Sequence, residues 1–476
     1  MAQPIEKTLV QFEKGRIDLK GCYKHLNDFE RHRLQELWQM CIERFDTPIE
    51  SLTGAKNSNI SLPNIGVDEK EVSKPPKNPN AKVFMDCIYD QNVSQKVGKK
   101  LVPVDFVSTC KDNTLRSQMW ESFREDVPDT LALRFLRARN WDVEKALDMI
   151  LTTIKWRYMD NVEEKIFYGE TLNEASLMYK GTSFIHGVDK LGHPIIWSPS
   201  AAHFQKDQPF SQMKRYLVWI METARKFLHY PHEKVCLIMD LSNHSTANMD
   251  WPFVKMFLKY LSTFYPECLG VAIVYNGPWF FPAVFKLISP LIDPNVAMKI
   301  QFVKNEEGLL KFINKDQLIK IRGGDNNYEY EYIPPNENEN IKMANLEEKQ
   351  IALEKRNIII DELTELTNKW IEAGNLTKEL DSKLDNLTNP KSNNNGNNKN
   401  NDDPESDDDI DEITKKLDEA IKNELEIHQL RDECQERFAA AARNLDQYTR
   451  ARSLYNRIGV LDEDNVDWSK VQKQFM

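Results

Sequence analysis

The sequence predicts an α/β protein built on a mixed, largely parallel sheet, with long helices added before and after it. Residues 181–335 alternate strand-like apolar runs with helical patterns, and residues 113–180 have helical patterns throughout. Residues 341–387 and 410–455 are rich in Glu, Lys and Leu, which is typical of long helices. Strands that alternate with helices need crossover connections, and these produce a largely parallel sheet.

The composition argues against several classes of protein. The 476 residues, enough for about two or three domains, carry a net charge of −11, which argues against a protein that coats nucleic acid. The mean hydropathy of −0.59 argues against a polytopic membrane protein. Seven cysteines without a CxxC pair, and an N-terminus without an apolar signal segment, favour reduced thiols and a cytoplasmic location.

The N-terminal part is expected to consist of a helical segment over residues 1–46 and a flexible linker over residues 47–98. Within 28–46, apolar residues recur every three or four positions and form one stripe. Residues 47–82 are rich in Ser, Asn, Pro and Lys, a composition that disfavours regular structure.

A helical lobe is predicted over residues 99–180. Asp129 and Asp142 are candidate N-caps, because Asp side chains accept hydrogen bonds from the first free amides of a helix. Asp142 precedes an apolar stripe that runs from Val143 to Ile154.

Residues 181–335 are predicted to form the main lobe around the sheet. The strand candidates are Thr182–Ile185, Pro194–Ser198, Val235–Leu241, Gly270–Tyr275 and Lys299–Val303. The helical patterns lie at 211–229, 253–264 and 279–291. The nearly unbroken apolar run Val235–Met239 suits a strand that is covered on both faces.

The C-terminal part is expected to contain a helical extension over residues 336–387 and a helix with a tail over residues 410–476. Between them, residues 388–409 are rich in Asn and Asp and predict a disordered linker. The helices could pack on the main lobe, bind a partner or rest on a membrane. Their mixed charge argues against strong binding to anionic membranes.

Enzyme motifs are not supported by the sequence. Gly187–Gly192 is followed by His193 rather than by Lys and Ser or Thr, so a hairpin turn is favoured over a phosphate loop. His229 and His232 fit a solvated loop better than a metal site, and no GxSxG, GxGxxG or HExxH motif occurs. Asp240 ends a buried strand, and a structural role is favoured there. We therefore expect a binding protein, not an enzyme, with no metal and no cofactor.

The run Leu133–Ala146 (LRFLRARNWDVEKA) resembles the N-terminal signature of the CRAL-TRIO lipid-binding family. Further motifs follow in the family's order, namely Asp189–Pro194, Ile238–Leu241, Tyr265–Glu267, Asn276–Pro278, Leu291–Pro294 and Gly323–Gly324. Within the family the chain is similar to the fungal phosphatidylinositol transfer proteins. Its helical tail, including Tyr448–Tyr455, resembles one subgroup of them. The resemblance covers most of the chain but not the linker or the Asn/Asp tract.

The resemblance implies a helical N-lobe and a sheet that floors an apolar lipid cavity, with a mobile gate helix at the mouth. The gate candidate, Trp279–Ile292, is apolar on nearly every side, as expected for a helix that is buried or in contact with lipid. An ordinary buried crossover helix is the alternative. The gate residues are Trp279, Phe280, Phe281, Phe285, Leu287, Ile288, Leu291 and Ile292.

The resemblance also implies that Arg139, Glu267 and Lys299 bind the headgroup of phosphatidylinositol. Cationic side chains suit the phosphate, and a carboxylate accepts hydrogen bonds from the inositol hydroxyls. Asn140 and Val296 stand where the family often has Lys and Thr, so weaker binding is expected.

A second lipid is implied to lie near cavity hydroxyls at Ser245 and Tyr265. Ala247 and Leu261 stand where the family can have hydroxyls, so the cavity is expected to be more apolar. Burying a choline phosphate with few partners is costly. The second lipid is therefore expected to be a neutral one, such as a sterol or squalene, rather than phosphatidylcholine.

Together these inferences predict a phosphatidylinositol transfer protein that exchanges phosphatidylinositol with a second, apolar lipid between membranes. It is expected to contact intracellular membranes transiently and not to bind nucleic acid. The alternative is a lipid-sensing adaptor that presents lipid to a phosphoinositide kinase or another partner through the C-terminal helices. A lipid-modifying enzyme is the least favoured hypothesis.

Overall fold

The computed structural model describes residues 11–12, 14–63, 80, 82–84, 105–388, 407–462 and 465–472. Most of the predicted flexible linker at 47–98 and most of the predicted disordered linker at 388–409 lie outside these residues. Among the described residues, each helix is either too short or too polar to cross a bilayer.

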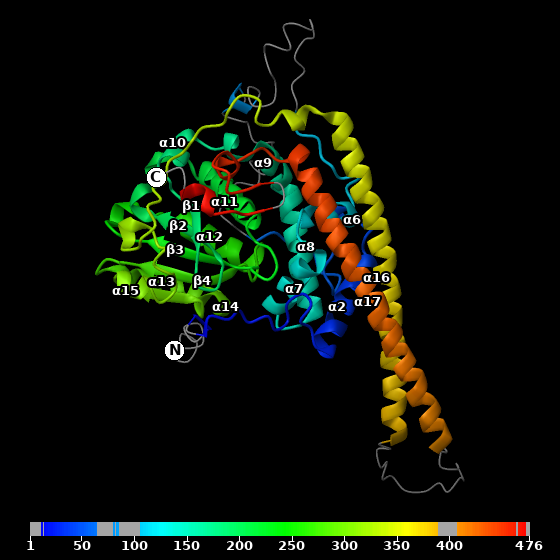
Figure 1. Ribbon diagram of the computed structural model, residues 1–476. Helices are drawn as coiled ribbons and strands as arrows, with labels where there is room; N and C mark the ends of the chain where they lie inside the picture. The colour runs from blue at the N-terminus through cyan, green and yellow to red at the C-terminus, as the bar shows by residue number, and fades with distance from the viewer. Residues whose placement is uncertain are drawn as a thin grey trace, which may run out of the picture.

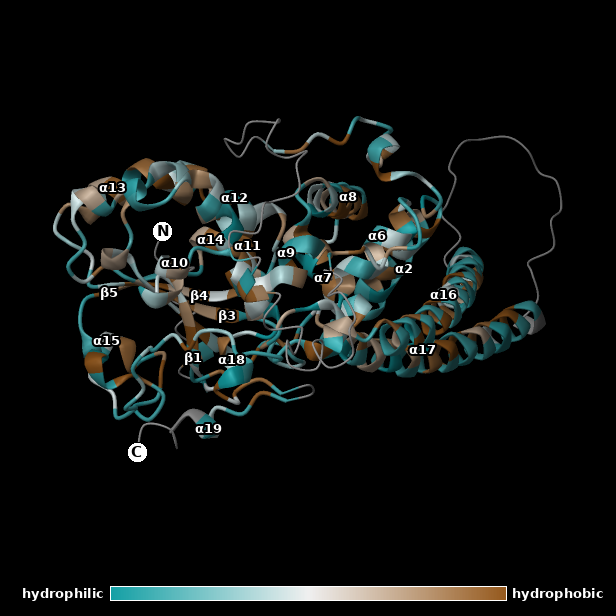
Figure 2. Ribbon diagram, turned by 90° about the horizontal axis from the view of Figure 1, so that it is seen from above, coloured by the Kyte–Doolittle hydropathy of each residue, from teal (hydrophilic) through white to brown (hydrophobic). Residues whose placement is uncertain are grey.

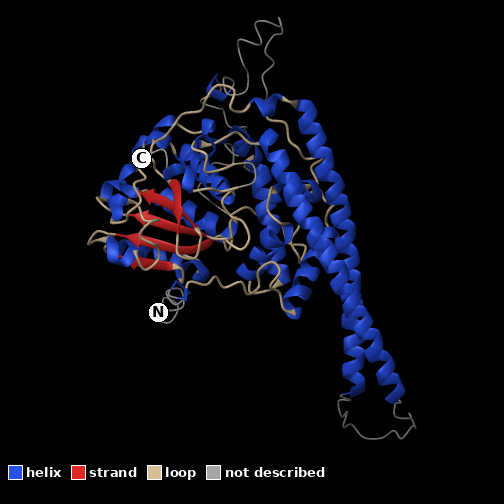
Figure 3. Ribbon diagram, in the orientation of Figure 1, coloured by secondary structure: helices blue, strands red, loops and turns tan. Residues whose placement is uncertain are grey.

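A five-stranded sheet lies at the centre of the larger lobe, in the order β1-β2-β3-β4-β5 (Figure 3). β1 (Phe184–Val188) pairs antiparallel with β2 (Pro194–Pro199). β2, β3 (Val235–Asp240), β4 (Leu269–Tyr275) and β5 (Ile300–Val303) are parallel neighbours. The mixed, largely parallel sheet is therefore confirmed.

The turn between β1 and β2 follows from its sequence. Gly187 and Gly192 have positive φ angles, and the carboxylate of Asp189 accepts hydrogen bonds from the amides of Leu191 and His193. β1 begins two residues later than the predicted start at Thr182. The reason lies in residue 183, whose backbone amide and carbonyl are both bonded to a tyrosine hydroxyl instead of a strand.

Three helices of this lobe match the predicted helical patterns and lie between the strands. They are α11 (Phe210–Arg225), α12 (Trp251–Thr263) and α13 (Phe281–Ile288). Two single-turn helices, α14 (Pro294–Ala297) and α15 (Glu306–Leu309), precede and follow β5. Figure 2 shows α12 and α13 on one side of the sheet, with α15 on the other.

The helical N-lobe contains α6, α7, α8, α9 and α10, and the N-terminal helix α2 packs against it. Their bounds are α2 (Asp28–Ile42), α6 (Leu115–Phe123), α7 (Pro128–Ala138), α8 (Val143–Met159), α9 (Val162–Tyr168) and α10 (Ala175–Tyr179). Asp142 caps α8 as predicted, by accepting a hydrogen bond from the amide of Lys145. The predicted cap Asp129 is wrong. Val127 is the N-cap of α7, and the Asp129 side chain is buried in an ion pair with the C-terminal part of the chain.

The start of the predicted linker differs from the structure. Ile49 and Leu52 are buried, and Ile49–Ser51 forms a single 3₁₀ turn. Their side chains join the apolar core of the N-lobe, so the packed structure continues beyond residue 46. The segment is polar in composition, so its sequence alone did not show that these two apolar residues are buried.

The long C-terminal helices form an antiparallel hairpin, drawn in yellow and orange in Figure 1. α16 (Leu346–Thr388) and α17 (Asp407–Thr449) each have 43 residues. The hairpin packs on the lobes from the start of α16, and its contacts with α2 reach Lys378 and Glu424, whereas its far end projects beyond the body (Figure 1). α17 begins inside the predicted linker, because Asp residues suit the first turn of a helix.

After α17 the chain returns to the larger lobe through α18 (Leu454–Arg457) and α19 (Ser469–Gln472). The Tyr455 hydroxyl accepts a hydrogen bond from the amide of Ile185 in β1 at 2.7 Å. Arg457 forms a buried ion pair with Glu170. The C-terminal segment is thus part of the packed structure, which agrees with the first of the three alternatives for the tail.

Candidate functional site

An apolar cavity of about 230 Å³ lies between the sheet, α11, α12 and α13. Side chains alternate along a strand, so one face of the sheet supplies the floor. Leu237 and Met239 of β3, and Ala272 and Val274 of β4, line it. The helices supply further apolar walls, among them Met213, Leu217, Ile220, Phe253, Phe257 and Leu261.

The helix α13 separates this cavity from solvent. Phe281, Phe285 and Ile288 line the cavity, whereas Trp279 and Leu287 are 91% and 68% exposed. Of the other predicted gate residues, Phe280 is half-buried, Leu291 is exposed and Ile292 lines the cavity. No residue of α13 is fully buried, which contradicts an ordinary buried crossover helix. A helix that presents apolar side chains both to a cavity and to solvent suits a lipid gate.

Glu267 and Lys299 meet at the edge of the sheet where the parallel strands begin. Lys299 directly precedes β5, and its ammonium group lies 3.1 Å from the Glu267 carboxylate, just before β4. Burial alone would raise the pKa of Glu267, but the charges of Lys299 and Lys234 lower it overall. Glu267 is therefore an ionised acceptor at neutral pH, beside two cations.

Arg139 is not joined to this pair. It follows α7, and its guanidinium donates a hydrogen bond to the carbonyl of Ala138. Among the described residues, no hydrogen bond or ion pair links it to Glu267 or Lys299. The structure brings only two of the three predicted headgroup residues together.

Sequence reasoning missed three charged residues at this edge. Arg137 pairs with Glu233 at 3.3 Å and donates to the carbonyl of Gly21 at 2.7 Å. Glu233 and Lys234 directly precede β3, as Glu267 precedes β4 and Lys299 precedes β5. Because the beginnings of adjacent parallel strands share one edge of a sheet, the charged residues before each predicted strand were a usable signal.

The predicted cavity residues have different outcomes. Leu261 and Tyr265 line the cavity. Ser245 and Ala247 are exposed and lie outside its lining, because they belong to a capped 3₁₀ turn in which Ser245 bonds Asn248. The Tyr265 hydroxyl donates to the buried carboxylate of Glu222 at 2.8 Å. None of these residues offers the lipid a free hydroxyl in this structure.

Polar side chains that sequence reasoning missed line the other end of the cavity. They are Ser200, His203, His244, Asn248 and Asp250. Ser200 follows β2, and His244 lies four residues beyond the end of β3. The carboxyl ends of parallel strands are a common place for ligand sites, and this rule was the available signal.

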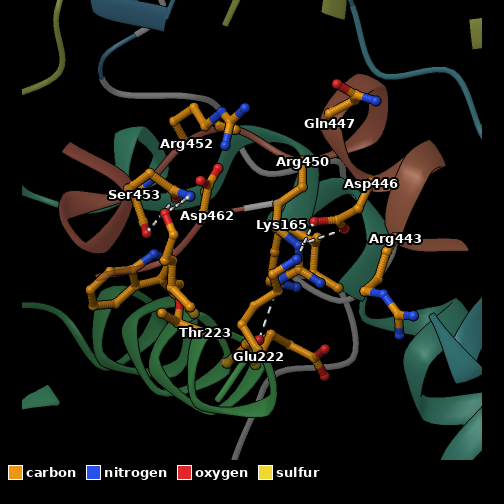
Figure 4. Close-up of a pocket in the computed structure, with 18 residues that line it drawn as sticks. Lys165, Glu222, Thr223, Arg443, Asp446, Gln447, Arg450, Arg452, Ser453 and Asp462 are labelled. Atoms are coloured by element: carbon orange, nitrogen blue, oxygen red, sulfur yellow. Dashed lines mark hydrogen bonds and ion pairs between the residues drawn. The ribbon is translucent and has the colours of Figure 1, made fainter. Parts of the chain in front are cut away.

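A second, much smaller pocket lies between α9, α11 and the end of α17 (Figure 4). The pocket has a volume of about 50 Å³, and oppositely charged side chains that pair with one another line it (Figure 4). Asp446 pairs with Lys226 and with Arg450, each at 2.8 Å. Arg450 also donates to the backbone carbonyl of Glu222. Lys226 thus attaches the hairpin to the larger lobe, and a further pair of Asp446 with Arg124 at 2.8 Å attaches it to the N-lobe. The pocket is too small and too polar for a lipid chain.

The remaining candidates from the sequence have structural roles. Asp240 pairs with Arg322 and accepts a hydrogen bond from the amide of Ser242, as the structural interpretation predicted. The His232 ring bonds the carbonyl of Leu191. Within the described part of the chain, no group of three His, Cys, Asp or Glu side chains could hold a metal ion.

Comparison with known proteins connects this architecture to one family. Residues 178–324 match the model described as the CRAL/TRIO domain, and residues 82–151 match its N-terminal domain. A CRAL-TRIO domain-containing protein of Schizosaccharomyces pombe is 32% identical over 353 residues, which cover 73% of this chain and 69% of that protein. Phosphatidylinositol transfer protein CSR1 of Eremothecium gossypii is 33% identical over 280 residues, 56% of this chain and 64% of that protein.

A solved structure titled "Crystal structure of Sfh5" aligns with 54% of this chain and 96% of its own, at 16% identity and a TM-score of 0.41. The sequence matches extend over both lobes and appear in the order of the family's two domains. The apolar cavity, its sheet floor and the helix α13 beside it thus belong to a member of the CRAL/TRIO family.

Proposed function

We propose that this protein carries phosphatidylinositol between membranes and exchanges it for a second, less polar lipid. The observation that carries the proposal is the apolar cavity, with a charged cluster (Glu267, Lys299 and Lys234) at one end and the partly exposed helix α13, the proposed gate, along its side. The relative named as a phosphatidylinositol transfer protein supports the same function at 33% identity.

The cavity meets the physical need of such a carrier. Transfer of each methylene group of an acyl chain into water costs about 0.8 kcal/mol of free energy, so a carrier must enclose the chains. The present volume of about 230 Å³ lies below the range of about 300–1,000 Å³ of ordinary ligand pockets. We therefore infer that α13 moves outward to admit a lipid.

The charged cluster suits the headgroup. Lys299 and Lys234 offer positive charge to the phosphate, and the Glu267 carboxylate accepts hydrogen bonds from inositol hydroxyls. The cavity lining includes Cys268 and Ile300, the sequence neighbours of Glu267 and Lys299. Chains inside the cavity would thus leave the headgroup at this edge. Arg139, at the end of α7, remains a proposed phosphate contact.

The exposed side of the gate is the proposed membrane contact. Trp279, Leu287 and Leu291 are exposed on or beside α13, and Phe302 of β5 packs against Phe285 at a ring distance of 4.9 Å while it stays half exposed. Insertion of these side chains into a bilayer would stabilise the outward position of the gate. Association with intracellular membranes would then be peripheral and brief.

The test is transfer of labelled phosphatidylinositol between vesicles by wild type, Lys299→Ala and Lys304→Ala. The two lysines lie at opposite ends of β5, and Lys304 is exposed. We expect Lys299→Ala to lose most of the transfer because the phosphate and Glu267 lose their cation, whereas Lys304→Ala transfers normally. Equal transfer by both variants would refute the headgroup site, and no transfer by wild type would refute the carrier.

A lipid-sensing adaptor is the second candidate. The two hairpin helices have exposed apolar side chains at Leu376, Ile421 and Leu425, and the far end of the hairpin projects beyond the body (Figure 1). An adaptor would bind phosphatidylinositol but transfer it poorly, so the same assay with a binding measurement separates the two functions.

A further inference from the structure

The cavity has a second polar end, at the edge of the sheet opposite Glu267 and Lys299. Its polar lining residues follow the carboxyl ends of β2 and β3, whereas the charged cluster precedes the amino ends of β3, β4 and β5. Its central groups are two histidines, His203 and His244, which the transfer of phosphatidylinositol does not use.

His203 is held by an ionised carboxylate. Its Nε2 lies 2.9 Å from Asp250, whose other oxygen accepts from the amide of Phe253 at the start of α12. Burial alone would raise the pKa of Asp250, but these two hydrogen bonds lower it overall. A carboxylate only accepts, so Nε2 carries a proton, and in the neutral ring Nδ1 is the acceptor. Among the described residues, Nδ1 is buried and meets no donor.

His244 is held by a hydroxyl. Its Nδ1 lies 2.9 Å from the Ser200 hydroxyl, which itself donates to the backbone carbonyl of Asp240 at 3.0 Å. A carbonyl oxygen can only accept, so the single hydrogen of the Ser200 hydroxyl is used in the bond to Asp240. The His244 Nδ1 must then be the donor to Ser200. Burial lowers the pKa of His244, which keeps the ring neutral at neutral pH.

The second nitrogen of His244 is then an acceptor as well. Nε2 lies 3.3 Å from the Met249 sulfur, and a thioether has no hydrogen to donate. Met249 also lines the cavity, and methionine side chains change conformation at little cost. A ligand group can therefore take the place of the sulfur beside Nε2.

In the part of the chain that the structure describes, two acceptors without donors at this end of the cavity, the buried Nδ1 of His203 and the Nε2 of half-buried His244, select the chemistry of the ligand. A buried acceptor that lacks a donor is costly, so a ligand that supplies one is favoured. A phosphodiester offers acceptors only, and a pure hydrocarbon such as squalene offers neither donor nor acceptor. A lipid hydroxyl donates one hydrogen bond and brings no charge into the apolar cavity.

We propose that this end of the cavity binds an uncharged lipid alcohol, whose hydroxyl donates to His244 Nε2 after the Met249 side chain turns aside. His203 Nδ1 is the neighbouring second acceptor. This inference rests on the proposed function, because it names the chemical class of the exchanged lipid. Sterols and diacylglycerols share this chemistry, and the test distinguishes them.

The test uses matched ligands that differ by one hydrogen-bond donor. Purified full-length protein is titrated with cholesterol and its methyl ether, and separately with 1,2-dioleoylglycerol and its methyl ether. We expect one alcohol of the two pairs to bind roughly three- to tenfold more tightly than its ether, as the value of one hydrogen bond predicts. The pair that shows the difference identifies the class of alcohol.

Two variants locate the effect. In His244→Phe the difference between alcohol and ether should disappear, because the ring stays and the acceptor is lost. In Met249→Ala the alcohol should bind more tightly than in wild type, because Nε2 is uncovered. Wild type that binds alcohols and ethers equally, or binds neither, would overturn the proposal, and this comparison stands even if a variant fails to fold.

Phosphatidylinositol binding is measured on the same preparations of wild type and Lys299→Ala. Loss of phosphatidylinositol binding with intact discrimination between alcohol and ether would refute the carrier proposal and leave the alcohol site standing. Normal phosphatidylinositol binding without such discrimination would refute the alcohol site alone.

Discussion

The contact between Arg431 of α17 and Asp129 of α7 provides a sharp test of how the hairpin is attached. The Arg431 guanidinium binds both Asp129 oxygens, and the two side chains are 0% and 1% exposed. Trp38 and Gln435 donate further hydrogen bonds to the same carboxylate, at 2.7 and 3.0 Å. Arg431→Ala would leave a buried carboxylate with neutral partners only.

The expected loss follows from this burial. Removing one partner of a buried ion pair costs about 3–5 kcal/mol, because the remaining charge is neither solvated nor paired. That is a large part of the 5–15 kcal/mol that typically stabilises a domain. Urea unfolding followed by tryptophan fluorescence measures it, and Trp38 and Trp370 both lie against the guanidinium.

Arg437 is the matched control. It lies on the same helix and binds both oxygens of Glu362 on α16, but the two side chains are 52% and 44% exposed. Exposed pairs contribute about 0.2–1 kcal/mol, so Arg437→Ala should be nearly neutral. If the free energies of unfolding of the two variants agree within about 1 kcal/mol, burial does not decide the strength of these contacts and the reasoning fails.

Two further predictions concern pH and membranes. Burial, and after it the charge of Asp129, raises the pKa of Asp432 to about 7. The unfolded Asp has a pKa of about 4, so the wild-type fold loses stability as the pH rises from about 4 towards 7. Asp432→Asn cannot ionise, so its free energy of unfolding in urea, relative to wild type, should increase over this pH range. A decrease would contradict the raised pKa of Asp432. Trp279→Ala should weaken vesicle binding by roughly a factor of ten, because a large side chain no longer enters the bilayer. Ile358→Ala, which removes an exposed apolar residue of α16, should leave vesicle binding unchanged. Similar losses for the two variants in a vesicle sedimentation assay would exclude α13 and its flanks as the docking surface.

Local signals in the sequence predicted much of the fold. The apolar run at Val235–Met239 forms β3, Gly187–Gly192 spans the turn to β2, and Asp142 caps α8. Each of these features depends on residues within a few positions of each other, where backbone preference and side-chain period act directly. The gate pattern at 279–292 was visible for the same reason.

The site is a different case, because its parts come from distant positions. The sequence predicted Glu267 and Lys299 by motif, and it did not show that the charges of Lys234 and Arg137 also act on Glu267. It assigned Ser245 to the cavity, although the cap of a short turn holds that residue at the surface.

By itself, the sequence determined the order of strands and helices, the apolar character of the gate and the motifs of the family. Only the tertiary structure decided that Asp129 pairs with Arg431, 302 residues away, rather than capping its own helix. It alone brought His203 and His244 to one end of the cavity, at the ends of neighbouring strands. The physical reason is that burial and pairing depend on long-range packing, which leaves no period and no fixed spacing in the chain.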